Sequence, residues 1–345
     1  MDRESDASQP SSPLPGSGTE WVGLPAGDGT PHQIYGLPVL AELPKLEQRR
    51  EPREWQPKKR WKLGIVLFLL TCASMWISAS HALVILDWRG LPIPIIFFDA
   101  LLESDGPVFM FAMMSVLFCH EMGHFLQSLR YRMPSSVPYF IPMPLSPIGT
   151  MGAVILMSGR NRNRKELFDI GLSGPWAGLL VAFPMLCYGT IVAKIVTPAE
   201  LENAVKVTHF PDCLLVQWLN AWLRPDLGPS QELWMNPWLL AGWGATLLTG
   251  LNMLPVGQLD GGHTAYALFG KRAHWLARAA MLVAGVYIVT SRDYGWIVMY
   301  GLVLFMRPSH PPTLDDAEPL GWPRWALGFV SLFIPVICLA PMPNF

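Results

Sequence analysis

The chain has 345 residues, of which 51% are hydrophobic and only 15% are charged, and its mean hydropathy is +0.30. This composition fits a multi-span membrane protein better than a soluble domain. The formal net charge of −1 gives no general attraction to nucleic acid, so we expect no nucleic-acid partner. The five cysteines are scattered and form no CxxC pair, which argues against a disulfide framework.

The first part of the chain, to about Lys45, is rich in Pro, Ser and Gly and has no sustained hydrophobic pattern. Such a composition is typical of disorder. The stretch lacks the apolar region of a signal peptide, and the early acids Asp2, Glu4 and Asp6 argue against an organelle transit peptide. We therefore expect residues 1–60 to form a disordered cytosolic tail that ends in basic residues.

Long apolar segments follow, several of which approach the roughly 20 residues that a membrane-spanning helix needs. They lie at about 63–86, 108–129, 167–196, 233–254, 277–290, 294–306 and 325–340. The two segments after Ala277 are short and could form one helical hairpin. Residues 92–102 are too short and too acidic at their end to span, which favours an interfacial or re-entrant piece. We expect an all-α polytopic membrane protein with about six or seven transmembrane helices, a core at 61–307, and a polar linker with a final span at 308–345.

The distribution of Lys and Arg predicts the orientation, because cytosolic loops carry an excess of both. Basic residues gather before the first span, after the second, after the fourth and after the hairpin. The opposite loops hold only Arg89, Lys206 and Arg224. The N-terminus is therefore expected to be cytosolic.

The second apolar segment contains His120-Glu121-Met122-Gly123-His124. Ionisable groups inside a membrane segment are costly and usually functional. The spacing places both imidazoles on one helical face, one turn apart, where they can share a zinc ion, while Glu121 points in a neighbouring direction and can act on a water. The alternative is a helix whose histidines only hydrogen-bond to neighbouring helices, so a third ligand is needed before the motif counts as a site.

Asp260 is the candidate third ligand, because it follows the fourth span among residues that break a regular helix, Pro255, Gly261 and Gly262. Irregular backbone at membrane depth is tolerated only inside protein or beside a water-filled cavity. Asp-Gly is also a common pair in surface turns, which is the alternative explanation. The predicted topology puts Asp260 and His124 in the same half of the membrane and completes a His, His, Asp set with one open position.

With these two motifs, HEMGH at 120–124 and NMLPVGQLDGG at 252–262, the chain resembles the site-2 proteases, zinc metalloproteases that cut other proteins within the membrane. The stretches 138–142, 149–153 and 171–178 also look like that family. The resemblance implies that His120, His124 and Asp260 bind one Zn²⁺ per chain and that Glu121 is the catalytic acid/base. It further implies that Asn252 helps to hold the substrate or the transition-state oxygen. No PDZ-like insertion is evident between the motifs.

Five prolines in Met133–Gly159 forbid a normal helix there, although the segment is apolar. It could be a re-entrant extended or β segment beside the active site that offers a strand edge to an unwound substrate, or a cytosolic loop on the headgroups. The Gly174-x-x-x-Gly178 spacing predicts close packing of the third span against the metal helices. His263 could support the metal ligands from outside, but after a glycine pair we expect it to be solvated instead, and we assign no role to His81, His209, His274 or His310.

The predicted function is zinc-dependent endopeptidase activity on client membrane proteins, with a substrate helix and the lipid bilayer as partners and a bacterial cell membrane as the location. The sequence does not define an oligomeric state. One alternative is a transporter with broken helices, which would need an internal repeat that the sequence lacks. Another is an inactive family member that acts as a scaffold or chaperone, against which the intact ligand set and Glu121 argue.

Overall fold

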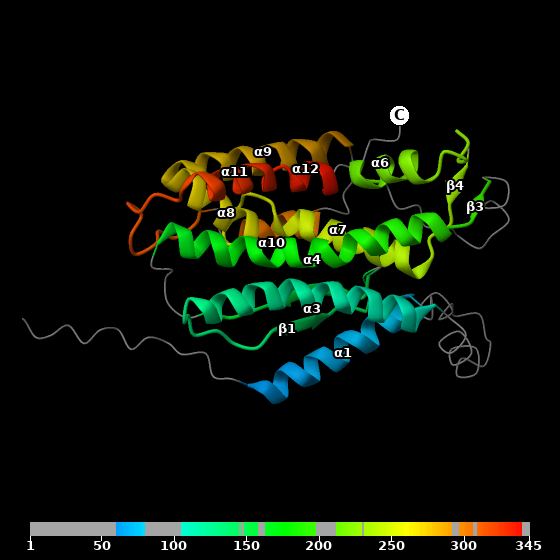
Figure 1. Ribbon diagram of the computed structural model, residues 1–345, viewed down its shortest axis with the longest axis horizontal. Coiled ribbons are helices and arrows are strands. Elements are labelled where there is room, and N and C mark those ends of the chain that lie inside the picture. The colour runs from blue at the N-terminus through cyan, green and yellow to red at the C-terminus, as the bar shows by residue number, and fades with distance from the viewer. Residues whose placement is uncertain are drawn as a thin grey trace, which may run out of the picture. The chain divides into compact units, whose positions relative to one another are not determined.

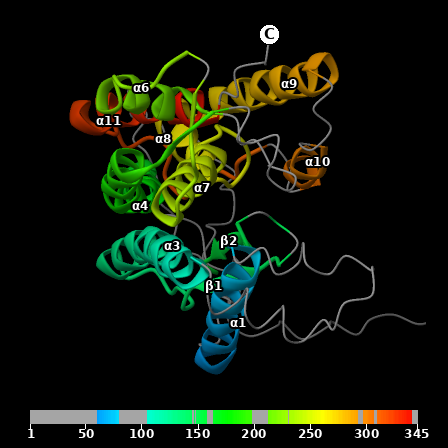
Figure 2. The same cartoon turned by 90° about the vertical axis from the view of Figure 1, so that its right-hand side faces the viewer.

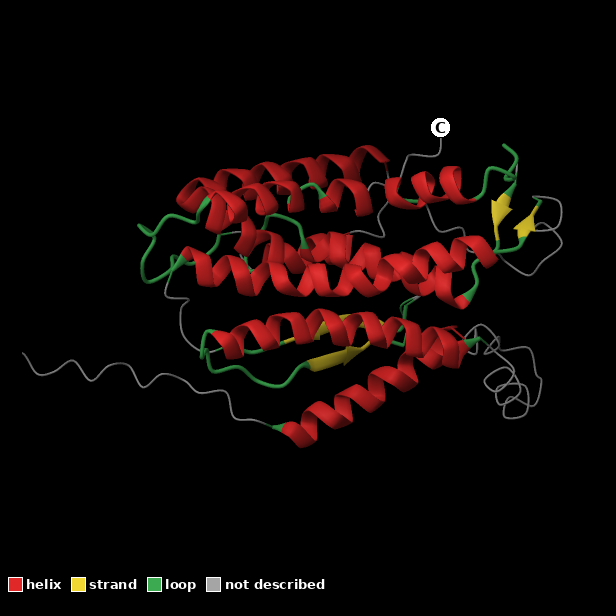
Figure 3. Ribbon diagram, viewed as in Figure 1, coloured by secondary structure: helices red, strands yellow, loops and turns green. Residues whose placement is uncertain are grey.

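The computed structural model describes residues 60–79, 105–144, 146, 148–157, 163–197, 212–229, 231–291, 297–305 and 309–339 (Figure 1). All of them belong to one compact unit, Trp55–Phe345. The predicted N-terminal tail and the predicted interfacial piece at 92–102 lie outside the described residues. The described part of the chain is mostly helical, as predicted (Figure 3).

The helices are α1 Trp61–Ala79, α3 Gly106–Arg130, α4 Arg164–Val192, α6 Leu214–Leu223, α7 Pro237–Asn252, α8 Asp260–Phe269, α9 Ala273–Ser291, α10 Ile297–Phe305, α11 Trp322–Ser331 and α12 Ile334–Leu339, with a short 3-10 turn η1 at Gly270–Arg272. The strands are β1 Tyr139–Pro142, β2 Thr150–Val154, β3 Ile195–Val196 and β4 Glu232–Leu233. Two antiparallel hairpins result, β1 with β2 and β3 with β4.

Five helical segments of the described residues are long and apolar enough to cross a membrane: Trp61–Ala79, Gly106–Arg130, Arg164–Val192, Asp260–Thr290 and Trp322–Leu339. The polytopic membrane class is thereby supported, and the count of six or seven spans stays a prediction. The fourth of these segments contains the 3-10 turn, where Gly270 takes a positive φ of 56° and separates α8 from α9. It is therefore not one straight helix.

The segment expected to span at 233–254 forms the 16-residue helix α7, which begins at Pro237. The later start has a local cause, because the side chain of Asn236 accepts hydrogen bonds from the backbone N–H groups of Trp238 and Leu239 and caps the helix. Leu233 lies instead in β4. The helix ends at Asn252, just before the Pro255 turn.

Helices α3, α4 and α7 pack against one another, with α4 and α7 side by side and α3 against both (Figures 1 and 2). Small residues allow this close packing: a Cβ added at Gly189 or at Gly242 would overlap α7 or α4, respectively. A core of buried side chains fills the space between the helices, including Phe109, Met113 and Ala182.

The β1–β2 hairpin packs beside α1 and α3 (Figure 2). Tyr139 pairs with Val154 and Phe140 with Ala153, and the register shifts before Pro142 pairs with Thr150. The extended conformation predicted for this proline-rich segment is confirmed, while its re-entrant placement in a membrane stays a prediction.

Candidate metal centre

The three predicted metal ligands meet although they come from two separate helices. The Nε2 atoms of His120 and His124, both on α3, lie 3.2 Å apart. Asp260, the first residue of α8, places Oδ2 3.3 Å from His120 Nε2 and Oδ1 3.3 Å from His124 Nε2. These donor atoms all lie within 4.8 Å of one another, so one ion can contact all three. The structure thus brings the predicted ligand set together at one point.

The environment of His124 suits a metal ligand. Its Nδ1 atom lies 2.7 Å from the backbone carbonyl oxygen of Ile170 on α4. Because a carbonyl only accepts, Nδ1 must carry the proton and donate, which leaves the Nε2 lone pair free for a cation. Ligating histidines almost always show this arrangement. Two neutral imidazoles and one carboxylate are also a donor set that zinc accepts, with a further position open.

The imidazole rings of His120 and His124 lie against two glycines of α4. A Cβ added at Gly174 would overlap the His124 ring, and one at Gly178 would lie 3.2 Å from His120 Nδ1. At Gly123, between the two histidines, a Cβ would come within 2.5 Å of the Ser173 carbonyl oxygen of α4. The close packing predicted from the Gly174-x-x-x-Gly178 spacing is therefore confirmed, and it occurs at the metal centre itself.

Asp260 reaches the centre because the chain turns sharply after α7. Gly257 has a positive φ of 57°, and the turn packs back on the start of α8 so tightly that a Cβ at Gly261 or Gly262 would overlap its backbone. The Asp260 side chain is only 15% exposed. A surface turn is therefore the wrong explanation for this Asp-Gly pair. The carboxylate also lies at a helix N-terminus, where a negative charge is favoured.

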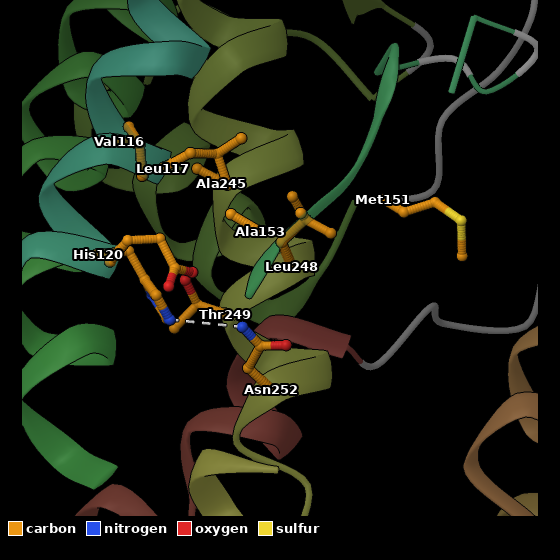
Figure 4. A pocket seen from close by; sticks show the side chains of 11 residues that line it. Val116, Leu117, His120, Met151, Ala153, Ala245, Leu248, Thr249 and Asn252 are labelled. Atoms are coloured by element: carbon orange, nitrogen blue, oxygen red, sulfur yellow. Dashed lines mark hydrogen bonds between the residues drawn. The ribbon is translucent and has the colours of Figure 1, made fainter. Parts of the chain in front are cut away.

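Glu121 and Asn252 lie beside the ligands on the wall of a cavity of about 40 Å³ (Figure 4). Glu121 is 4% exposed, and Asn252 Nδ2 lies 3.5 Å from His120 Nε2. The other lining residues come from α3, β2 and α7: Val116, Leu117, His120, Met151, Gly152, Ala153, Ala245, Leu248 and Thr249. Such a volume can hold water, which hydrolysis needs. The hairpin strand β2 forms the wall opposite α3, with the Met151 side chain pointing away from His120.

The sequence did not reveal the further polar contacts that surround this centre. His263, expected to be solvated, is only partly buried, and its Nδ1 lies 2.7 Å from His310 Nε2, a contact that the sequence does not predict. Asp169 of α4 accepts two hydrogen bonds from Arg324 of α11. These partners are separated by 47 and 155 residues in the chain, so no local spacing could have indicated either contact.

The family model described as "Peptidase family M50" matches residues 108–290. This match covers more than half of the chain and contains every residue of the metal centre described above. The chain belongs to peptidase family M50, the site-2 protease family, which confirms the resemblance drawn from the two motifs. Between those motifs the described residues form helices and short strands, and no PDZ-like domain is evident there.

Several curated relatives are named as probable zinc metalloproteases. The "Probable zinc metalloprotease EGY1, chloroplastic" of Oryza sativa subsp. japonica is 30% identical over 319 residues, which is 85% of this chain and 53% of the relative. The protein of the same name from Arabidopsis thaliana is 28% identical over 242 residues, 67% of this chain and 42% of the relative. The chain thus spans about half the length of the curated relatives it matches. No solved structure matches this chain.

Proposed function

We propose that this chain is a zinc-dependent intramembrane endopeptidase that hydrolyses peptide bonds in or near transmembrane segments of client membrane proteins. The observation that supports this most is the convergence of His120, His124 and Asp260 from two helices onto one point. In the proposal these residues hold one zinc ion. Membership of family M50 and the metalloprotease names of the relatives support the same activity.

Each residue of the centre has a separate part in the reaction. A zinc ion at this site would supply a Lewis acid that polarises the scissile carbonyl. Glu121 accepts a proton from the attacking water and delivers it to the leaving amide nitrogen. Asn252, at the end of α7 and on the cavity wall, holds the substrate carbonyl or the oxygen that develops charge in the transition state. The buried surroundings strengthen these polar contacts because they exclude bulk water.

The client segment must be extended before it is cut, since a helical backbone hides its carbonyls. The neighbouring strand β2 supports the idea that the client pairs with this hairpin, because main-chain pairing with a strand edge binds an extended peptide without demanding one sequence. In this proposal β1 and β2 form a re-entrant segment at membrane depth. A helix of the client protein and the surrounding lipid are the partners.

The proposed orientation places the N-terminus in the cytosol, as the excess of Lys and Arg on one side predicts. Helix α7 brings the five apolar segments to six spans, and α10, if it crosses the membrane beside α9, brings them to seven. The word "chloroplastic" in the relatives' names describes those plant proteins. Our proposal of a bacterial cell membrane rests on the sequence of this chain alone.

The decisive experiment compares Glu121→Gln and His120→Ala with the unchanged full chain, purified in detergent, for zinc content and for cleavage of a model membrane peptide. We expect Glu121→Gln to abolish cleavage and to keep about one zinc per chain, because the amide cannot accept the water proton. His120→Ala should lose both the bound zinc and the cleavage activity. Cleavage at an unchanged rate by Glu121→Gln would remove Glu121 from the mechanism. An unchanged chain that binds zinc but cuts no peptide would instead support a scaffold.

A further inference from the structure

Two polar contacts tie α3 to α4 along one face of α3. The first joins His124 Nδ1 to the Ile170 carbonyl oxygen at 2.7 Å. The second joins the hydroxyl of Tyr131, directly after α3, to Asp169 Oδ2 at 2.5 Å. Because His124 and Tyr131 are about two helical turns apart, both point toward α4. Their partners on α4 are adjacent residues, so whatever fixes Asp169 also fixes the carbonyl that orients His124.

Arg324 of α11 fixes Asp169 from the other side. Its Nε donates to Asp169 Oδ1 at 2.7 Å and its Nη2 donates to Oδ2 at 2.9 Å. Such a two-pronged contact between a planar guanidinium and a carboxylate sets orientation as well as distance. The Asp169 side chain is 11% exposed and that of Arg324 is 37% exposed, so the pair is partly withdrawn from water.

The helix contact leaves little room for the metal ligand to adapt if this support is lost. The Gly123 backbone lies against the Ser173 carbonyl, and the His124 ring lies against Gly174. A small rotation of the start of α4 would therefore move both the Ile170 carbonyl and the Gly174 backbone against which the His124 ring lies. Metal centres are sensitive to such outer contacts, whose loss typically lowers metal affinity by about 10–100-fold.

We propose that Arg324 is a positioning residue for the metal ligand His124, acting through Asp169 and the Ile170 carbonyl. The inference rests on the proposed metal site. It assigns a role to the C-terminal part of the chain, which lies beyond the residues 108–290 that the family model matches. The metal centre is then complete only when α11 is in place.

A second ion pair offers a matched control, because it joins the same two parts of the chain. Lys165 Nζ lies 2.7 Å from Glu318 Oε1, which attaches the segment before α11 to the first turn of α4. Lys165 precedes Ile170 by more than one helical turn and is oriented toward Glu318. If Arg324 served only to hold the C-terminal helices in the fold, loss of the Lys165–Glu318 pair should also lower Co²⁺ affinity, although by less because Asn163 also donates to Glu318.

The test measures binding of Co²⁺, which reports its ligand geometry by absorption, to the metal-free full chain in detergent. We expect Arg324→Gln to weaken Co²⁺ affinity about tenfold and to change the absorption band, while Lys165→Gln leaves both unchanged. Tyr131→Phe removes one hydroxyl on the other side of Asp169 and should shift both readouts in the same direction by less. The Asp169→Asn variant should bind Co²⁺ no better than the Asp169→Asn/Arg324→Gln double variant, because the two residues act as one unit.

The outcomes separate this inference from the proposed function. If His124→Ala retains Co²⁺ at full affinity, the proposed metal site is wrong and the inference fails with it. If His124→Ala loses Co²⁺ while Arg324→Gln and Tyr131→Phe bind it like Lys165→Gln, the metal site stands and the positioning role is refuted. Should Arg324→Gln not fold, Arg324→Lys, which keeps the charge but loses the two-pronged contact with Asp169, distinguishes the same two outcomes.

Discussion

At Gly174 a single methyl group should disable the metal centre, because the His124 ring occupies the space that a Cβ would need. We expect Gly174→Ala to lower zinc affinity at least about tenfold by displacing His124. The measurement is zinc competition with a chelating dye. The Cβ that Gly178→Ala adds would lie 3.2 Å from His120 Nδ1, so this variant should lower zinc affinity too, but by less.

The matched control is Gly301→Ala on α10, where no heavy atom lies within 4 Å of the added Cβ. That variant should keep the zinc affinity of the unchanged chain. Equal affinities for Gly174→Ala and Gly301→Ala would show that His124 tolerates displacement and that the space at Gly174 is not needed for metal binding.

Among single residues, the sequence predicted those whose chemistry is unusual for their surroundings. His120, Glu121 and His124 are ionisable groups in an apolar helix, and Asp260 follows a helix-breaking turn, so each carries a local signal. Arg324 and His310 carry none, because a charged or imidazole side chain near a span end is ordinary. Their partners are defined only by the packing of distant helices.

At the level of elements, the strand-pairing proposal concerns β2, whose residues Met151, Gly152 and Ala153 line the same cavity as Glu121. In the Glu121→Gln variant, which we expect to bind a client peptide without cutting it, a photo-crosslinking group at Met151 or Val154 should capture that peptide. Both side chains are 44% exposed, so the group can be introduced without disturbing the core.

A crosslinking group at Trp222 of α6, which is 74% exposed, is the control and should not capture the peptide. Capture at Trp222 but not at β2 would refute the strand-pairing proposal and favour a client site elsewhere.

The elements themselves were predictable where the apolar pattern was long, as in α3 and α4. The start of α7 was placed too early, because apolar residues continue through Leu233 while the Asn236 cap and Pro237 set the true beginning. Proline content predicted the extended segment at 133–159, but pairing of β1 with β2 depends on a register that composition does not define.

For the whole molecule, the lysine and arginine pattern predicts which end of α4 faces the cytosol. Arg164, at the start of α4, donates to the Ala267 carbonyl of α8, near the exposed Lys271. Arg224 donates to the carbonyls of Thr190 and Ala193 at the other end, beside Asp226. A membrane-impermeant thiol reagent on the cytosolic side should label Lys271→Cys and spare Asp226→Cys. Labelling of Asp226→Cys but not of Lys271→Cys would show that the chain has the opposite orientation in the membrane.

The stability of the whole molecule should depend on pH through His310. Its imidazole forms a hydrogen bond with His263 of α8 and stacks on the ring of Tyr266. Its backbone carbonyl accepts a hydrogen bond from His274 of α9. Burial, and after it the neighbouring His274, lower the pKa of His310 from 6.5 to about 4, although its bond to Pro311 and the charge of Asp316 oppose this. Between about pH 4 and pH 6.5 the His310 imidazole is therefore protonated in the unfolded chain and neutral in the folded chain.

This contribution to stability is complete above about pH 6.5 and is lost as the pH falls toward about 4, by roughly 3 kcal/mol in all. Thermal unfolding in detergent at several pH values should show this loss, and His310→Gln should flatten the dependence. A variant with the same slope as the unchanged chain would mean that other groups cause the acid sensitivity.

A void of about 40 Å³ beside Glu121 admits a few water molecules but no polypeptide. In the proposed function a client segment needs more room than this, so β2 would have to move away from α7 when a client enters. In that proposal the ease with which β2 moves, more than the catalytic groups, decides which membrane proteins are cut and how fast.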